Sequence, residues 1–510
     1  MIISLSVLVI TIIVSGTYAL YKAQLSKNIG VNTTTHGLAY YINYVKGTDI
    51  TAATLNPSTS YEGGASSDIE FWKKDDSYDI YGKIELTVNT IGTNLSNSPA
   101  LKYAVVNNGN VLKEGSLKGT TSGSKVTILK NLYLEQTKQI YTVYVWLDNS
   151  EELGNISNES LSISVDCTAS LQKEPTAADT IISLYTSAAK VTATNNSITY
   201  NTAPSVSLMN DRLGGTTTDL DGGNIRYYGA NPNNYIYFNC SDYSNQTSST
   251  CETWRIIGVF DGKLKLIKGS QIGTYSWDNK NISTGAEDDR GKNDWTTARL
   301  MKLLNPDDYY INDNNDKDSE GNYLGYSLYY NSASGMCFTD GGVNYSACDF
   351  TSTGIKNDET RNMIAETTYN LGGWNDTGVY PNEIYEYERG TTVYTGRPTT
   401  WTGKIALAYP SDYGYAADLN QCKQTLANYD NSTCTSNNWM KAIITDNGSN
   451  HGWLLTPDSS YSYGAWYSHG NVGEYFTGAA RGAVPVLSLS SKLGIESGDG
   501  SSSNPYKLSA

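Results

Sequence analysis

The spacing of the cysteines restricts this fold more than any other feature of the sequence. Six of the seven cysteines form three pairs of near neighbours. The pairs are Cys240 with Cys251, Cys337 with Cys348, and Cys422 with Cys434, at separations of 11, 11 and 12 residues. None has the CxxC spacing of a zinc site, and the chain has only 3 histidines. We therefore predict three short-range disulfides, although six cysteines formally allow about 15 connectivities.

Disulfides persist only in oxidising compartments, so the paired cysteines favour an exported protein. Each local loop is expected to contribute about 2–3 kcal/mol to stability. Cys167 has no neighbour of this kind. We expect it to be a free or buried thiol near a domain junction.

The N-terminus supports export independently. Ile2 to Val14 is an apolar run with the length of a signal-peptide core, and Ser15-Gly16-Thr17-Tyr18-Ala19 supplies small residues for cleavage. We predict that residues 1–19 are a signal peptide or, if uncut, a membrane anchor over Ile2–Leu20. A buried helix is the alternative. No basic residue precedes the run, which leaves open a start upstream. The expected location is extracellular or at the cell surface.

Composition narrows the possible partners. At 510 residues the chain exceeds what one hydrophobic core usually supports. Its mean hydropathy of -0.42 argues against a polytopic membrane protein. A net charge of -15 disfavours nucleic acid and anionic membrane surfaces. The membrane is expected as a partner only through the N-terminal segment.

Residues 20–167 have the pattern of a β-sandwich. Apolar residues alternate with polar ones in several short runs, and Asn- and Gly-rich turns separate the runs. Three runs carry the pattern: Ile84, Leu86 and Val88; Tyr141, Val143, Val145 and Leu147; and Leu161, Ile163 and Val165.

This region resembles the camelysin/TasA-like exported proteins of Firmicutes. The resemblance rests on Ser15-Gly16-Thr17-Tyr18-Ala19, Ile91-Gly92-Thr93-Asn94 and the strand Ile140-Tyr141-Thr142-Val143-Tyr144-Val145-Trp146-Leu147-Asp148. It implies export through a cleaved leader and a β-sandwich fold. The protease activity associated with that family needs a zinc ligand set, and this segment offers only His36. We therefore do not extend the activity to this chain.

The second half is predicted to be a separate α+β domain over residues 191–510, after a linker and short helix over 168–190. Trp254 to Ile267 should form a hairpin that turns at Asp261-Gly262. Asn293 to Asn305 has helical periodicity with a capping residue at its start.

Two motifs near the C-terminus resemble C-type-lectin-like domains, including those related to formylglycine-generating enzymes. They are Gly452-Trp453-Leu454-Leu455-Thr456-Pro457 and Arg481-Gly482-Ala483-Val484-Pro485-Val486-Leu487-Ser488-Leu489. The resemblance implies a variable surface loop between two strands. The predicted fold is therefore mainly β: an N-terminal β-sandwich followed by an α+β C-type-lectin-like domain. The enzymes' active-site cysteines have no counterpart, because all six paired cysteines are assigned to disulfides.

The segment between these motifs is the candidate binding site. Ser459 to Phe476 is rich in aromatic residues among Gly and Ser, a composition suited to recognition. Alternatively, the rings fold inward as a local core. The candidate ligand-binding residues are Trp453, Tyr461, Tyr463, Trp466, Tyr467, His469 and Arg481.

Metal and catalytic motifs are scarce. Asp316, Asp318 and Glu320 begin like a calcium loop, but Ser327 stands where the bidentate glutamate belongs. A hydrated acidic loop is the favoured interpretation. No HExxH or GxSxG motif occurs. In residues 191–510, His451 and His469 are the only histidines that could serve in a Ser–His–Asp triad. We predict no enzyme activity and no cofactor.

Three functions remain open. The first is a surface adhesin whose C-terminal domain recognises a glycan or a protein. The second is a fibre or biofilm-matrix subunit assembled by strand addition, and the third is a secreted polysaccharide hydrolase. The sequence determines neither the ligand nor the oligomeric state.

Overall fold

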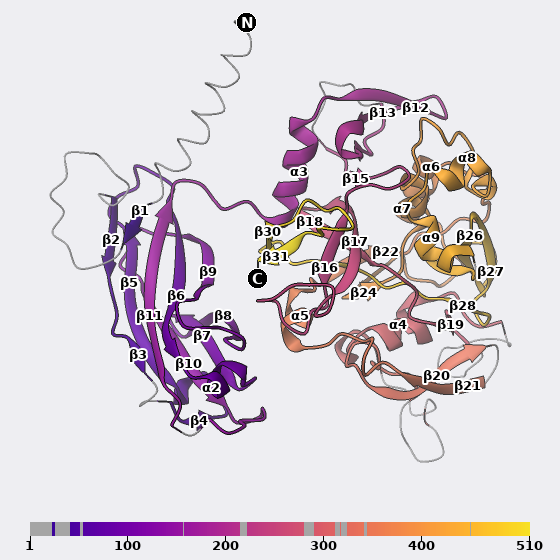
Figure 1. The fold of residues 1–510 in the computed structure, drawn as a ribbon. Coiled ribbons are helices and arrows are strands. Elements are labelled where there is room, and N and C mark those ends of the chain that lie inside the picture. The colour runs from indigo at the N-terminus through magenta and orange to yellow at the C-terminus, as the bar shows by residue number, and fades with distance from the viewer. Residues whose placement is uncertain are drawn as a thin grey trace, which may run out of the picture. The chain divides into compact units, whose positions relative to one another are not determined.

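The computed structural model describes residues 23–25, 41–51, 55–156, 158–214, 222–279, 290–311, 317, 324–340, 344–448 and 450–509. The fold is mainly β, as the sequence predicts. Two compact units divide the chain, Met1–Glu174 and Pro175–Ala510 (Figure 1). The predicted leader over residues 1–19 lies outside the described residues.

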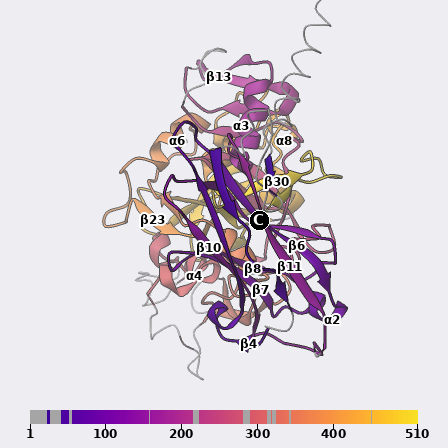
Figure 2. The ribbon, with the colours of Figure 1, turned by 90° about the vertical axis from the view of Figure 1, so that its left-hand side faces the viewer.

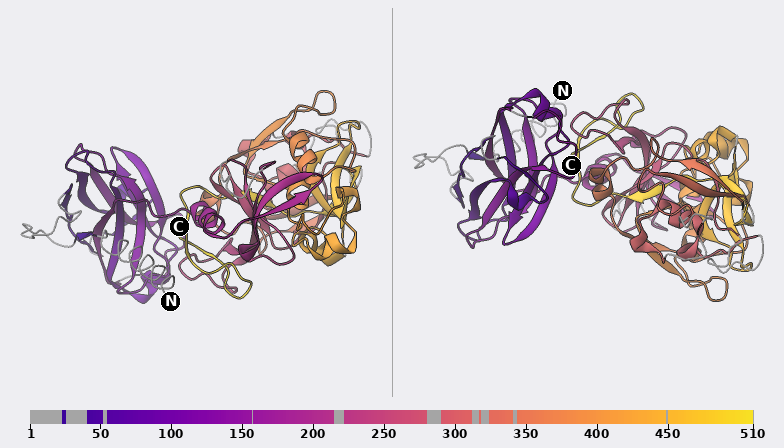
Figure 3. Two further views of the ribbon diagram at one scale, coloured as in Figure 1. Left: turned by 90° about the horizontal axis from the view of Figure 1, so that it is seen from above. Right: turned by 90° about the horizontal axis from the view of Figure 1, so that it is seen from below.

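The first unit is a sandwich of two sheets whose inner faces share one core (Figures 1 and 3). One sheet contains β1 (Ala23–Leu25), β11 (Leu161–Ser170), β6 (Tyr81–Ile91), β9 (Lys125–Tyr133) and β3 (Ile50–Thr51). The other contains β2 (Ile42–Val45), β5 (Ala65–Lys73), β10 (Ile140–Asp148), β7 (Leu101–Asn107), β8 (Asn110–Ser116) and β4 (Pro57–Ser58). A short helix α2 (Thr93–Asn97) follows β6. Figure 2 shows β6, β10 and β11 of this unit from another side.

Period-two alternation builds this core, because successive strand residues point to opposite faces of a sheet. Ile84, Leu86 and Val88 are fully buried, and their neighbours on β6 are half-buried. Val143 and Val145 of β10 lie in the same core. The apolar residues of all three predicted runs are buried, but the burial alternates strictly only in β6, because Trp146 of β10 and Ser164 of β11 are buried as well.

The second unit contains two larger sheets. The first consists of β12 (Val191–Asn195), β13 (Ile198–Ala203), β14 (Leu208–Asn210), β15 (Ile225–Tyr227), β16 (Tyr235–Phe238), β17 (Glu252–Phe260), β18 (Lys263–Lys268), β24 (Ile405–Ala406) and β29 (Val486–Ser488). The second consists of β19 (Thr274–Ser276), β28 (Ala480–Gly482), β25 (Gly452–Pro457), β26 (Gly464–His469) and β27 (Asn471–Phe476).

Three two-stranded sheets and several helices complete this unit. The paired strands are β20 (Ser334–Asp340) with β21 (Asn344–Asp349), β22 (Thr367–Asn370) with β23 (Thr400–Gly403), and β30 (Gly494–Ser497) with β31 (Lys507–Ser509). The helices are α3 (Ala177–Ser187), α4 (Arg299–Leu304), α5 (Asp358–Met363), α6 (Pro381–Glu388), α7 (Pro410–Tyr415), α8 (Ser432–Ser436) and α9 (Lys441–Ile444).

The predicted hairpin is present as β17–β18. Asp261 and Gly262 both have positive φ, +49° and +70°, the backbone that a two-residue type I′ turn requires. The predicted helix over 293–305 is shorter than expected. The Asp294 side chain accepts a hydrogen bond from the Thr296 amide and caps a separate 3₁₀ turn. Ala298 then has extended backbone, so α4 begins only at Arg299.

The prediction for residues 168–190, a linker followed by a short helix, holds for the helix but places the start of the linker too early. Residues up to Ser170 belong to β11, where they continue its pairing with β6. Helix α3 begins with a capping box between Thr176 and Asp179. Its residues Ile181 and Tyr185 are buried in the core of the second unit. The predicted short helix therefore contributes to the core of the second unit.

The three predicted disulfides are present. The bonds join Cys240 to Cys251, Cys337 to Cys348, and Cys422 to Cys434. Cys167 is free and buried, as expected, because it points into the sandwich core from β11. Among the described residues, no helix has the length and apolarity needed to span a bilayer.

Candidate ligand-binding surface

The aromatic segment after Ser459 forms a hairpin and not the long loop expected from the sequence. Strands β26 and β27 pair from Gly464–Phe476 to His469–Asn471. Gly470 turns the chain between them with φ of +97°, a conformation that glycine adopts readily. In Figure 1 the two strands lie beside α9. The hairpin therefore holds its side chains on a sheet.

Alternation along β26 separates the predicted binding residues onto two faces. Tyr467 and His469 project from one face, half-buried and exposed respectively. Trp466 projects from the other, is fully buried and donates a hydrogen bond from Nε1 to the Trp374 carbonyl. The prediction that Trp466 contacts a ligand is therefore wrong, because this ring packs in the core.

Five side chains converge on the face that carries Tyr467. We call His451, Tyr467, His469, Tyr475 and Arg481 the Arg481 patch. The guanidinium carbon of Arg481 lies 3.9 Å from the ring centre of Tyr467 and 4.3 Å from that of Tyr475. Tyr475 sits diagonally across the hairpin from Tyr467, which explains their edge contact at 6.3 Å. The two rings hold the cation between them.

The two histidines of the patch stack on each other. The ring centres of His451 and His469 are 4.0 Å apart and nearly parallel, and His451 also contacts Tyr467 at 5.2 Å. Within the described part of the chain, neither imidazole hydrogen-bonds to a serine or a carboxylate. The hydrogen bonds of a Ser–His–Asp triad are thus not formed around these histidines among those residues.

Arg481 is a cation without an anionic partner among the described residues. Its Nε is buried and makes no hydrogen bond there. The terminal nitrogens also make none, and they keep access to solvent because they are not among the buried unpaired atoms. Burial lowers the pKa of Arg481, but a guanidinium remains charged at any ordinary pH. Burial, Arg481 and His469 together lower the pKa of His451, which favours its neutral form.

The remaining predicted residues lie near the patch or apart from it. Trp453 is fully buried, donates from Nε1 to the Tyr275 carbonyl and lies 5.5 Å from the Arg481 guanidinium. The Trp453 ring therefore packs beneath the surface of the patch and cannot contact a ligand itself. Tyr461 and Tyr463 stack on each other at 5.6 Å, and Arg290 covers Tyr463 at 3.9 Å. These two tyrosines form a separate contact group in the β25–β26 connection.

Glu474 marks the opposite face of the hairpin, where it pairs in register with Trp466. Burial, a hydrogen bond with Asp458 and the charges of Asp458 and Asp376 raise the pKa of Glu474 to about 8. Asp458 is itself buried and accepts the Tyr461 amide. The raised pKa favours the protonated form of Glu474 at neutral pH.

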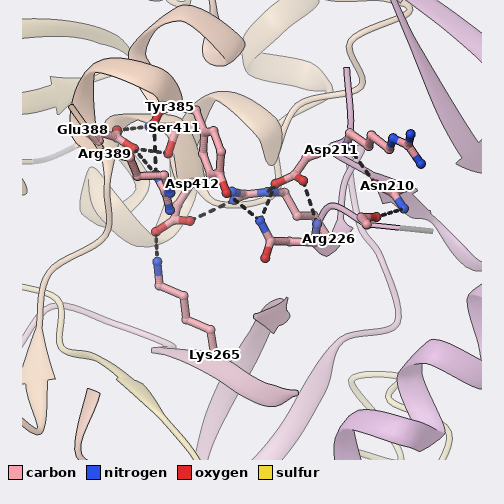
Figure 4. A network of polar contacts seen from close by, with 12 residues as sticks. Asn210, Asp211, Arg226, Lys265, Tyr385, Glu388, Arg389, Ser411 and Asp412 are labelled. Atoms are coloured by element: carbon pink, nitrogen blue, oxygen red, sulfur yellow. Dashed lines mark hydrogen bonds and ion pairs between the residues drawn. The ribbon is translucent and has the colours of Figure 1, made fainter. Parts of the chain in front are cut away.

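A second polar cluster lies inside the unit (Figure 4). Asp412 bonds to Arg226 at 2.9 Å and to Lys265, and Arg226 also bonds to Asp211 at 2.6 Å. All four side chains are at least nine-tenths buried. Burial acts to raise the pKa of Asp412, but the charges of Lys265 and Arg226 outweigh it and hold that pKa below its ordinary value. This network ties β15, β18 and α7 together.

Glu388 belongs to the same region. It is fully buried and accepts hydrogen bonds from the amide and hydroxyl of Ser411, and Arg389 lies 3.1 Å away. Burial raises the pKa of Glu388 to about 7. Because these groups are enclosed, we assign them to the framework and not to a ligand surface.

No set of three or more His, Cys, Asp or Glu side chains suited to a metal ion occurs among the described residues. The calcium candidates Asp316, Asp318 and Glu320, like His36, lie outside those residues.

Two patch residues were not on the list of candidate ligand contacts. His451 precedes β25 and meets His469 only because β25 pairs with β26. Tyr475 could have been identified from its alternation with Gly473 along β27. The structure thus brings together Tyr467, His469 and Arg481 above Trp453, and separates Tyr461, Tyr463 and Trp466 from them.

Comparisons with known proteins leave the family open. No family model matches the chain, and no curated protein matches it. The crystal structures of two single-substitution mutants of HCR/D share 11% and 10% sequence identity with it. They cover 51% and 50% of this chain and 76% and 75% of their own, with TM-scores of 0.15 and 0.14. Likeness at that level carries no argument about fold or function.

Proposed function

We propose that this chain is an exported cell-surface binding protein, an adhesin that recognises a glycan or protein ligand through the Arg481 patch. The observation that carries the proposal is a half-exposed group of aromatic rings around a cation that lacks a partner among the described residues. Rigid rings bury a large area at little entropic cost, and sugar rings stack on their apolar faces.

Export is supported by the three disulfides, which persist in an oxidising compartment. We retain the camelysin/TasA-like resemblance for the first unit, supported by its two-sheet sandwich. We also retain the C-type-lectin-like resemblance for the second, supported by the position of the β26–β27 hairpin between β25 and β29 in the chain.

The test is a glycan array with purified protein and a Tyr467→Ala, Tyr475→Ala variant. Both rings belong to the patch, so the variant should lose the binding profile of the parent. Tyr345→Ala is the matched control, because Tyr345 is 46% exposed on a different hairpin, β21. The control should bind as the parent does. Identical profiles for all three proteins would contradict the proposal.

A fibre subunit remains the second candidate. Ala23–Leu25 pairs with Cys167–Ala169 as an edge strand of only three residues. So short a strand makes few hydrogen bonds within its own chain. The segment would therefore lose little by pairing with the sheet of a neighbouring molecule instead. Electron microscopy over a range of concentrations tests this candidate, and monomers throughout would count against it.

A further inference from the structure

We propose that the ligand of the Arg481 patch is an acidic saccharide, whose carboxylate binds the Arg481 guanidinium while its sugar ring lies on Tyr475. This inference rests on the proposed function and names the class of ligand for the same site.

The charge of Arg481 carries the first step. Other buried or half-buried arginines in this unit have polar partners: Arg226 bonds to two aspartates, and Arg397 donates to Asn293 and Ser462. The Arg481 guanidinium lies against the rings of Trp453, Tyr467 and Tyr475, and its terminal nitrogens make no hydrogen bond among the described residues while staying open to solvent. Those nitrogens form a planar fork that matches a carboxylate in a bidentate pair.

The backbone beneath the rings carries the second step. Gly473 lies opposite Tyr467, and a methyl group at its Cα would come within 3.0–3.1 Å of the tyrosine ring. The Tyr467 ring therefore lies between this strand and the Arg481 guanidinium, which covers it at 3.9 Å, and the ring of the patch that stays open is Tyr475, 43% exposed. A flat ring beside a cation fits a saccharide that carries both an apolar ring face and a carboxylate.

The charge of the neighbourhood carries the third step. The chain has a net charge of -15, yet the patch contains an arginine and two imidazoles and no carboxylate. Glu474, the nearest acid along β27, pairs with Trp466 on the opposite face. An anionic ligand thus meets a local cation, and none of the five side chains of the patch is a carboxylate that would repel it.

The experiment measures affinity by titration calorimetry with the purified full chain. The probes are trigalacturonic acid and its carboxyl-reduced counterpart, which keeps the rings and loses the charges. A sulfated neutral trisaccharide and a glutamate-rich peptide are the comparison ligands. The variants are Arg481→Gln, Arg481→Lys and the control Lys492→Gln, which removes an exposed cation elsewhere.

The parent and the Lys492→Gln control should bind the acidic saccharide about tenfold or more tightly than the reduced one. The reduced saccharide has no carboxylate and so cannot form the charge-assisted pair with Arg481. Arg481→Gln should abolish this preference, and Arg481→Lys should keep part of it. Thermal unfolding of each variant shows that it is folded, and the lysine variant preserves the stem between the rings.

Equal affinity for the acidic and reduced saccharides would overturn the inference and leave the proposed glycan-binding function standing. Binding of the sulfated sugar or the peptide alone would also overturn it, by assigning another anion. If the parent binds none of the four ligands, both the inference and the proposal that the protein recognises a glycan are overturned. If Arg481→Gln keeps the preference for the acidic over the reduced saccharide, the ligand's carboxylate binds a residue other than Arg481 and the inference is wrong.

Discussion

Replacing Asp412 by asparagine should strongly destabilise the second unit. The Asp412 carboxylate bonds to both Arg226 and Lys265, and all three side chains are buried. In the variant Arg226 keeps Asp211 as a partner, at 2.6 Å. Lys265 keeps only ring contacts, with Phe260 and Tyr409 at 4.9 and 4.6 Å. The cost therefore falls mainly on one buried ammonium.

The magnitude follows from the two ways in which that ammonium can respond. Leaving a buried charge without its partner costs about 3–5 kcal/mol. Alternatively, Lys265 loses its proton. From an ordinary pKa of 10.5, deprotonation at pH 7 costs about 5 kcal/mol, and at pH 9 about 2 kcal/mol. We thus expect a loss of about 3–5 kcal/mol at pH 7 that shrinks as the pH rises.

The assay is urea unfolding followed by tryptophan fluorescence at pH 7 and pH 9. Only Trp72 and Trp146 of the 10 tryptophans lie in the first unit, so the signal reports mainly on the second. Asp430→Asn is the matched control, because it removes the same charge at an exposed site. Adding Lys265→Met to the Asp412→Asn variant should recover part of the loss.

Two results would refute this reasoning. A loss below about 1 kcal/mol, comparable to a surface pair, would mean that the network is hydrated. A loss of the same size at both pH values, with no recovery from Lys265→Met, would mean that the ammonium is not the source of the cost.

Three further predictions concern other parts of the molecule. Replacing Cys337 and Cys348 by serine should lower stability by about 3 kcal/mol in a non-reducing melt, and an unchanged melting temperature would contradict a structural role. Gly473→Ala should weaken ligand binding by displacing the Tyr467 ring while the melting temperature stays near that of the parent; unchanged affinity would mean that the ring position does not matter. Glu388 has its pKa raised to about 7 in the fold, so its contribution to stability is complete below pH 4.5 and is lost as the pH rises through 7. In urea unfolding, the free energy of unfolding of Glu388→Gln minus that of the parent should therefore rise by about 3 kcal/mol between pH 4.5 and pH 8. A difference that does not change with pH would disprove the raised pKa of Glu388.

Local patterns predicted the elements that depend on near neighbours. The cysteine pairs join because 11 or 12 residues form a small loop, and Asp261-Gly262 turns because both positions accept positive φ. The helix over 293–305 was overestimated, because periodicity does not reveal that the Asp294 side chain caps a separate turn. The hairpin at Gly470 was missed for a related reason: its aromatic and glycine composition is also that of a loop.

The sequence alone thus determined the mainly β fold, the three disulfides and the lack of a pairing partner for Cys167, since each follows from patterns along the chain. Only the tertiary structure decided which aromatic residues meet the solvent. Trp466 and Tyr467 are adjacent and chemically similar, yet one strand position places them on opposite faces. It also decided that His451 meets His469 and that Arg226 meets Asp412, 186 residues away. Such contacts depend on how distant strands pair, which no local spacing encodes.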